Sequence, residues 1–161
     1  GGVILVLFIV QLLHKAIQKS MEHSVQIATV TIRLRNKTEQ LRLLVDSGNC
    51  LTDPISGVPV IVVQMKCVQS LFTDAELRYM EVGAADAVLR LPDLSDRLRL
   101  LPFQTVGYRG LMLGVRLDEL QIQASSMQGM STVRKDVVMA LSPQQFASDG
   151  SYQGVIPPLL L

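Results

Sequence analysis

An almost unbroken apolar run over residues 1–13 constrains the fold more than any other feature of this sequence. The run ends at His14 and Lys15. It is shorter than the roughly 20 residues that cross a bilayer, no basic region precedes it, and no small-residue cleavage site follows it. We therefore expect neither a complete transmembrane helix nor a signal peptide, but the C-terminal part of a membrane helix with further spans upstream. A buried amphipathic core helix is the alternative interpretation.

The charges that follow this run favour the membrane interpretation, because basic residues beside a span mark its cytoplasmic side. Before residue 43 only Glu22 and Glu39 are acidic. The basic residues of the same stretch include His14, Lys15, Lys19, Arg33, Arg35, Lys37 and Arg42. We divide the chain into residues 1–19, the end of a transmembrane helix with a juxtamembrane segment, and residues 20–161, one domain on the cytosolic side of the cell membrane.

Composition narrows the classes of function. With 48% hydrophobic and 18% charged residues among 161, the chain has enough apolar surface to fold around a core. A net charge of +1 argues against a nucleic-acid partner, which requires a clustered basic surface. Cys50 and Cys67 are too few for a disulfide framework, and His14 and His23 have no ligand spacing to them. We expect two ordinary buried thiols in a reducing compartment, and neither a metal nor a cofactor.

The pattern then becomes alternating, which is typical of strands. Residues 25–34 predict a long strand, Asn36 and Lys37 a turn, and residues 41–45 a second strand running back. Residues 53–57 predict another turn, and 58–63 a buried strand with Pro59 near its start.

Residues 64–82 favour helix, with Thr73 or Asp74 as the N-cap. Further short strands are predicted at about 86–91, 98–106, 111–115, 119–124 and 133–141. The predicted fold is mainly β with one or two short helices.

The motif that carries chemistry is Asp46, Ser47 and Gly48 at the end of the apolar strand. The strand holds the Asp46 backbone in the core, Ser47 can brace the loop by hydrogen bonds, and Gly48 permits close approach and unusual dihedral angles. Two such loops face to face bring two carboxylates together, and these share one proton because both cannot ionise. One carboxylate then activates water while the other protonates the carbonyl oxygen. A plain strand-ending turn is the alternative interpretation.

Only one Asp-Ser/Thr-Gly occurs in the chain. A carboxylate pair of this type therefore requires a homodimer with one Asp46 from each subunit.

These residues resemble a known family. Residues 44–49, Leu-Val-Asp-Ser-Gly-Asn, and 51–60, Leu-Thr-Asp-Pro-Ile-Ser-Gly-Val-Pro-Val, are similar to the membrane-embedded aspartic peptidases that process the sporulation sigma-E factor precursor in endospore-forming bacteria. Segments 101–107, 110–114 and 152–159 follow in the order that family shows. The resemblance covers roughly residues 25–160.

The resemblance implies a retroviral-protease-like half-barrel that acts as a homodimer below a polytopic membrane domain. Asp46 would be the catalytic aspartate, with Ser47 and Gly48 completing its loop. The substrate would be the sigma-E precursor, which loses a short N-terminal pro-segment in the mother cell, and a signalling protein secreted from the forespore would be the activator. Gln104 stands where the family pattern has a basic residue.

Two further expectations concern the rest of the barrel. A later strand should lie beside the catalytic loop; residues 111–114 or 153–156 could supply it, and we favour the second. Residues 159–161 after it could form an interleaved strand at the dimer interface. Residues 106–110 have the glycines of a mobile hairpin tip that covers the cleft, although a plain β-turn explains them equally well.

Other interpretations fit less well. One is Cys50 as a nucleophile with His14 or His23, and another is a Ser-His-Asp triad. Both need a histidine, and both histidines of the chain are expected beside the membrane helix, away from the loop. A catalytically silent domain for dimerisation or signal reception would keep the barrel, but it would not need the carboxylate of Asp46.

Overall fold

The strands of this protein form one continuous sheet. The structure, a computed structural model, describes residues 2–48, 51–105, 107–124 and 129–161, without the side chains of 15–24, 84, 89, 105 and 108. Within these residues the strand order is β4-β5-β8-β3-β9-β2-β1-β6-β7. The strands are β1 (Ile27–Leu34), β2 (Lys37–Val45), β3 (Ile61–Gln64), β4 (Leu98–Thr105), β5 (Tyr108–Arg116), β6 (Glu119–Ala124), β7 (Thr132–Arg134), β8 (Val138–Ser142) and β9 (Gly154–Ile156).

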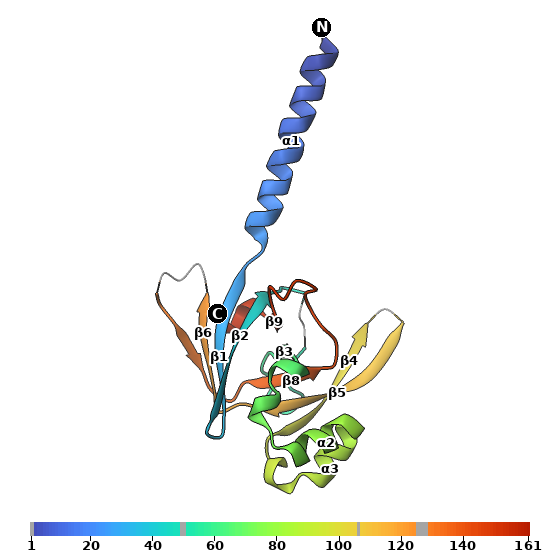
Figure 1. Cartoon of the computed structure of the whole chain (residues 1–161), viewed down its shortest axis with the longest axis vertical. Coiled ribbons are helices and arrows are strands. Elements are labelled where there is room, and N and C mark those ends of the chain that lie inside the picture. The colour runs from blue at the N-terminus through green and yellow to red at the C-terminus, as the bar shows by residue number, and fades with distance from the viewer. Residues whose placement is uncertain (1, 49–50, 106, 125–128) are drawn as a thin grey trace.

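Two short helices cover one end of the sheet, and one long helix stands away from the opposite end (Figure 1). The helices are α1 (Gly2–Ser24), α2 (Asp74–Val82) and α3 (Ala84–Arg90). Short 3-10 turns lie at Met65–Cys67, Gln69–Leu71, Pro92–Leu94 and Pro158–Leu160.

The β1–β2 hairpin forms as its alternating sequence predicts. On β1 every second side chain points into the core, and Ala28, Val30, Ile32 and Leu34 are buried there. The two strands pair in register from Ile27 opposite Leu44 to Leu34 opposite Lys37. The turn lies at residues 35–36, one residue earlier than predicted, because Arg35 takes up the left-handed backbone conformation that closes it.

Two parallel pairings bring distant segments together. β9 lies parallel to β2 and antiparallel to β3, and β3 lies parallel to β8. In Figure 1 β1 and β2 stand upright while β8 lies across the molecule, so the sheet is strongly twisted. The prediction of a mainly β half-barrel with short helices is confirmed.

The helical prediction for residues 64–82 is confirmed in part. The segment opens with two 3-10 turns and becomes α-helical only at Asp74. Thr73 is the N-cap: its hydroxyl accepts the Glu76 N–H, and the Glu76 carboxylate accepts the Thr73 N–H.

Two predicted strands are wrong. Residues 86–90 belong to α3 and Leu91 is its C-cap, because the alanines around Asp86 favour helix over strand. Residues 133–141 form two strands, since Asp136 has a left-handed backbone conformation with φ of 60° and interrupts the pairing.

The described apolar side chains of α1, within residues 3–13, are exposed, which contradicts the alternative of a buried core helix. They are Val3, Ile4, Leu5, Val6, Leu7, Phe8, Ile9, Val10, Leu12 and Leu13. In the part of the chain whose side chains are described, no helix has the length and apolar character needed to cross a membrane. Of the basic residues expected beside the membrane, Arg33 and Arg42 lie in the sheet and Arg35 in its first turn.

Candidate functional site

The candidate catalytic loop, residues 46–48, begins at a strand end whose backbone is hydrogen-bonded on both sides. Val45, the last residue of β2, donates its N–H to the Gln26 carbonyl at 2.9 Å. The Asp46 N–H donates to the Ile156 carbonyl at 3.0 Å. Asp46 is therefore fixed between β9 and the segment that leads from α1 into β1.

The Asp46 side chain emerges from this strand end, half-buried, while Ser47 and Gly48 are exposed. The Gly48 N–H donates to Asp46 Oδ1 at 2.8 Å, which orients the carboxylate. A Cβ at residue 48 would lie 3.2 Å from the same oxygen. Gly48 does not adopt a positive φ, so its contribution is this close approach and not the unusual dihedral angle that the sequence suggested.

The strand beside the loop is β9, as favoured from the sequence. Gly154, Val155 and Ile156 pair with Leu43, Leu44 and Val45 of β2. The other candidate, residues 111–114, lies in β5 and pairs with β4 and β8.

Gly154 permits this packing. A Cβ there would collide with the Val62 carbonyl oxygen and approach Leu43 Cδ2 to 2.8 Å and Val63 Cα to 3.0 Å. Two of these three neighbours are backbone atoms of β3, which cannot rotate away as a side chain can.

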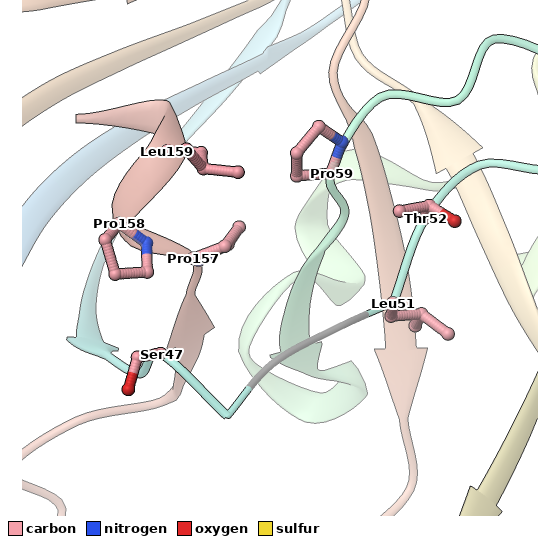
Figure 2. Close-up of a pocket in the computed structure, with 7 residues that line it drawn as sticks. All are labelled: Ser47, Leu51, Thr52, Pro59, Pro157, Pro158 and Leu159. Atoms are coloured by element: carbon pink, nitrogen blue, oxygen red, sulfur yellow. The ribbon is translucent and has the colours of Figure 1, made fainter.

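An apolar pocket of about 320 Å³ opens beside the loop. Figure 2 shows Ser47 at one end of it, with the C-terminal turn on one side and the return of the loop on the other. Leu159 and Pro59 face one another across the opening (Figure 2). The lining residues are Ser47, Leu51, Thr52, Pro59, Pro157, Pro158 and Leu159. Because none of the described lining residues carries a charge, the pocket suits an apolar group.

The C-terminal wall of the pocket is a 3-10 turn, so the interleaved strand expected at residues 159–161 is wrong. Its proline at residue 158 is suited to the first position of such a turn. Leu160 is buried in the core, whereas Leu159 is 80% exposed. Arg134 of β7 donates to the Leu160 carbonyl at 3.1 Å and to the Leu161 carbonyl at 3.4 Å, which holds the turn.

The opposite wall contains a buried carboxylate. Asp53 is 2% exposed, and its oxygens accept hydrogen bonds from the Ile55 and Ser56 N–H groups and from the Ser56 hydroxyl. Burial raises the pKa of Asp53, but these hydrogen bonds and the charge of Arg99 outweigh it and leave the pKa below its ordinary value. The carboxylate is thus held ionised within the turn.

The remaining candidates lie elsewhere. The thiol of Cys67 is half-buried, and burial together with Glu39 raises its pKa, so the nucleophilic thiolate is disfavoured. Cys50 and Asn49 lie outside the described residues, as does the side chain of His23.

The proposed hairpin tip joins β4 to β5 and projects to the side of the sheet (Figure 1). Val106 lies outside the described residues, and Gly107 has a φ of 84°, as a tight turn requires. Gln104 is exposed on β4.

The sequence patterns did not single out Asp53 and Arg99 as parts of the candidate site. The turn at residues 53–57 was predicted, and its Asp and Ser are typical of a turn that bonds to its own backbone. The approach of Arg99, 46 residues further along, has no local signal in the sequence.

One carboxylate on a rigid strand end beside an apolar pocket can accept a proton from water, but protonating the carbonyl oxygen at the same time requires a second acid. A hydrolytic centre of this kind would need a second carboxyl group beside Asp46.

The chain belongs to the sporulation factor SpoIIGA family, Peptidase U4, whose family model matches residues 1–160. A candidate sporulation sigma factor-processing peptidase of Bacillus thuringiensis subsp. kurstaki is 28% identical over 156 residues, covering 91% of both chains. The sporulation sigma-E factor-processing peptidases of Bacillus subtilis and Priestia megaterium are 28% and 23% identical over 83% and 84% of this chain. This chain spans 44% of the length of each of those two. No solved structure gives a significant match.

Proposed function

We propose that this protein is a membrane-anchored aspartic endopeptidase, active as a homodimer, that removes the N-terminal pro-segment of the sporulation sigma-E factor precursor. The observation that carries the proposal is the placement of Asp46, the aspartate of the chain's one Asp-Ser/Thr-Gly, at a strand end between β2 and β9. The membership of the SpoIIGA family and the names of its relatives support the substrate.

In this proposal two Asp46 carboxylates meet across a two-fold axis and share one proton. The ionised carboxylate takes a proton from water, and the oxygen of that water forms a bond to the carbonyl carbon of the substrate. The protonated carboxyl gives its proton to the carbonyl oxygen. Collapse of the tetrahedral intermediate breaks the C–N bond: the amine leaves with the proton that the first carboxylate took from water, and a hydroxyl of the intermediate gives its proton to the other carboxylate, which restores the shared proton. The Gly48 N–H holds Asp46 Oδ1 in the required orientation.

The exposed apolar side chains of α1 support anchoring to a membrane. An apolar surface of this extent is unfavourable in water and marks a contact with lipid or with another protein. Only two residues separate α1 from β1, and the Gln26 carbonyl accepts the Val45 N–H, so a membrane at α1 would lie near Asp46. We place the domain on the cytosolic face of the mother-cell membrane, with the secreted forespore signalling protein as its activator.

The test is co-expression of the full-length protein with a sigma-E precursor that carries its pro-segment. Shortening of the precursor on a gel is expected with wild type and is expected to disappear with Asp46→Asn, which preserves shape but removes the shared proton. Asp93→Asn, at an exposed position away from the loop, is the matched control and should cleave normally.

Cleavage by Asp46→Asn would overturn the proposal. A lack of cleavage with wild type, in the presence of the forespore signalling protein, would favour the catalytically silent dimerisation or signal-receiving domain instead.

A further inference from the structure

The turn at residues 53–57 has a buried charge that the proposed chemistry does not use. Asp53 follows Asp46 by seven residues, yet its carboxylate is almost fully buried. Burying a carboxylate costs several kcal/mol unless hydrogen bonds and an opposite charge offset the loss of water. We therefore expect the buried charge to have a structural role at this point.

Within the turn the carboxylate organises its own loop. Asp53 Oδ2 accepts the Ser56 hydroxyl at 2.6 Å and the Ser56 N–H at 3.2 Å, and Oδ1 accepts the Ile55 N–H at 3.2 Å. Backbone bonds close the same loop, from the Gly57 N–H to the Asp53 carbonyl and from the Asp53 N–H to the Val58 carbonyl. These contacts fix the shape of the turn, but all of them lie within it.

Arg99 ties this turn to the rest of the sheet. Its Nε lies 3.5 Å from Asp53 Oδ1, and its side chain is 14% exposed. The same guanidinium donates from Nη1 to the Leu98 carbonyl at 3.0 Å and to the Asp96 carbonyl at 3.2 Å. Arg99 is thus held at the start of β4 with its charge beside the Asp53 turn.

The two arms of the loop are the wall of the apolar pocket beside Ser47. Leu51 and Thr52 lie on one arm and Pro59 on the other. The Val60 N–H donates to the Leu51 carbonyl at 3.0 Å, and Thr52 and Pro59 form an isolated bridge. A displacement of Asp53 would therefore move both arms and change the width of the pocket.

We propose that Asp53 and Arg99 are a positioning pair, which fixes the wall formed by residues 51–60 against β4 and so determines how tightly the pocket holds an apolar part of the substrate. The consequence for substrate binding rests on the proposed function. The consequence for the rigidity of residues 51–60 does not.

The experiment compares three variants of the full-length protein. Arg99→Met removes the charge, Arg99→Lys retains it, and Arg97→Met is the matched control. Arg97 precedes β4 and forms an ion pair of 2.7 Å with Asp118, away from the pocket. Both Met variants lose one ion pair, so comparing them at equal folded fraction, measured by circular dichroism, removes the general effect on stability.

Two measurements are made on each variant. In cleavage of the sigma-E precursor, Arg99→Met should raise KM on the order of tenfold with kcat changed less than about threefold, because the pair acts on binding and not on Asp46. Arg99→Lys should restore most of the affinity. Hydrogen exchange of the Asp53, Gly57 and Val60 amides should accelerate in Arg99→Met but not in Arg97→Met.

Unchanged exchange at these three amides in Arg99→Met would overturn the proposal, as would a KM equal to that of Arg97→Met. If wild type itself cleaves nothing, the proposed function fails. In that case accelerated exchange still supports the rigid wall, so the two failures are distinguishable.

Discussion

Two aspartates in one loop receive opposite environments. Asp46 is half-buried, and the described contact of its carboxylate is one backbone N–H, from Gly48. Asp53 is buried, accepts three hydrogen bonds and faces Arg99. The carboxylate of Asp46 stays partly accessible to solvent, while that of Asp53 is fully engaged in structural contacts. Environment, and not residue type, separates a reactive aspartate from a structural one.

At the same scale, Glu76 holds the β1–β2 turn against α2. Both Glu76 oxygens bind the Arg35 guanidinium, at 2.8 and 3.1 Å, and one also accepts the Thr73 N–H. We expect Glu76→Gln to lower the free energy of unfolding by about 2 kcal/mol, less than for a fully buried pair because Arg35 keeps contact with water. Urea unfolding should show this loss, and Glu81→Gln, exposed on the same helix, should show almost none.

The pH dependence of this variant follows from the pKa of Glu76. Burial raises that pKa, but Arg35 and Thr73 lower it by more, so it lies below its ordinary value of 4.5. The stabilisation is fully present above about pH 4.5 and is lost as the pH falls through the lowered pKa. The stability difference between wild type and Glu76→Gln should therefore shrink as the pH drops below 4.5; a constant difference would contradict this account.

At the scale of elements, β9 depends on a residue without a side chain. Gly154→Ala would place a methyl group against the Val62 carbonyl of β3. We expect it to lower the free energy of unfolding by about 1–3 kcal/mol or more, because backbone must move. It should also reduce cleavage, since β9 holds the Asp46 N–H.

Gly114→Ala is the comparison for Gly154→Ala. Its Cβ would meet the side chains of Leu101, at 2.7 Å, and Val138, at 3.0 Å, whose ends can rotate. Gly154→Ala should therefore have a lower melting temperature than Gly114→Ala in thermal unfolding. A lower melting temperature for Gly114→Ala would show that the contact with backbone atoms does not cause the destabilisation.

Local patterns predicted the elements whose stabilising contacts are local. The alternation of β1 and the Thr73 cap needed only near neighbours, and β6 was predicted with its observed bounds. Residues 86–91 were wrongly predicted as a strand because a short apolar segment fits either a strand or a helix, and the alanines were the signal that should have decided. The break at Asp136 depends on one backbone conformation that the surrounding apolar residues conceal.

The candidate site, too, could be predicted only where a local pattern marks it. Asp46 was singled out from its motif. The segment of β9 was favoured because residues 159–161, which follow it, could form a strand at a dimer interface; β9 does lie beside the loop, but residues 158–160 form a 3-10 turn. The 3-10 turn of residues 158–160 and the contact of Arg99 with Asp53 arise from packing between distant segments, which no local pattern records.

At the scale of the whole molecule, α1 is expected to determine where the protein works. Replacing Leu5 and Ile9, both exposed and one helical turn apart, with lysine should abolish co-flotation with phospholipid vesicles. Val82→Lys changes an exposed apolar residue at the end of α2 and should leave flotation unchanged. Flotation of the double variant at wild-type level would contradict anchoring through α1.

The central claim is that two Asp46 carboxylates, one from each subunit, form one active site. Its most direct test is a titration in which wild-type and Asp46→Asn subunits are co-expressed in known ratios with the precursor. With equal amounts of wild-type and Asp46→Asn subunits, random pairing leaves about one-quarter of the dimers with two aspartates. Precursor cleavage should therefore fall to about one-quarter of that of the same total amount of wild-type protein. Cleavage that falls only to about one-half, in proportion to the wild-type subunits, would show that each subunit acts alone and would contradict the account.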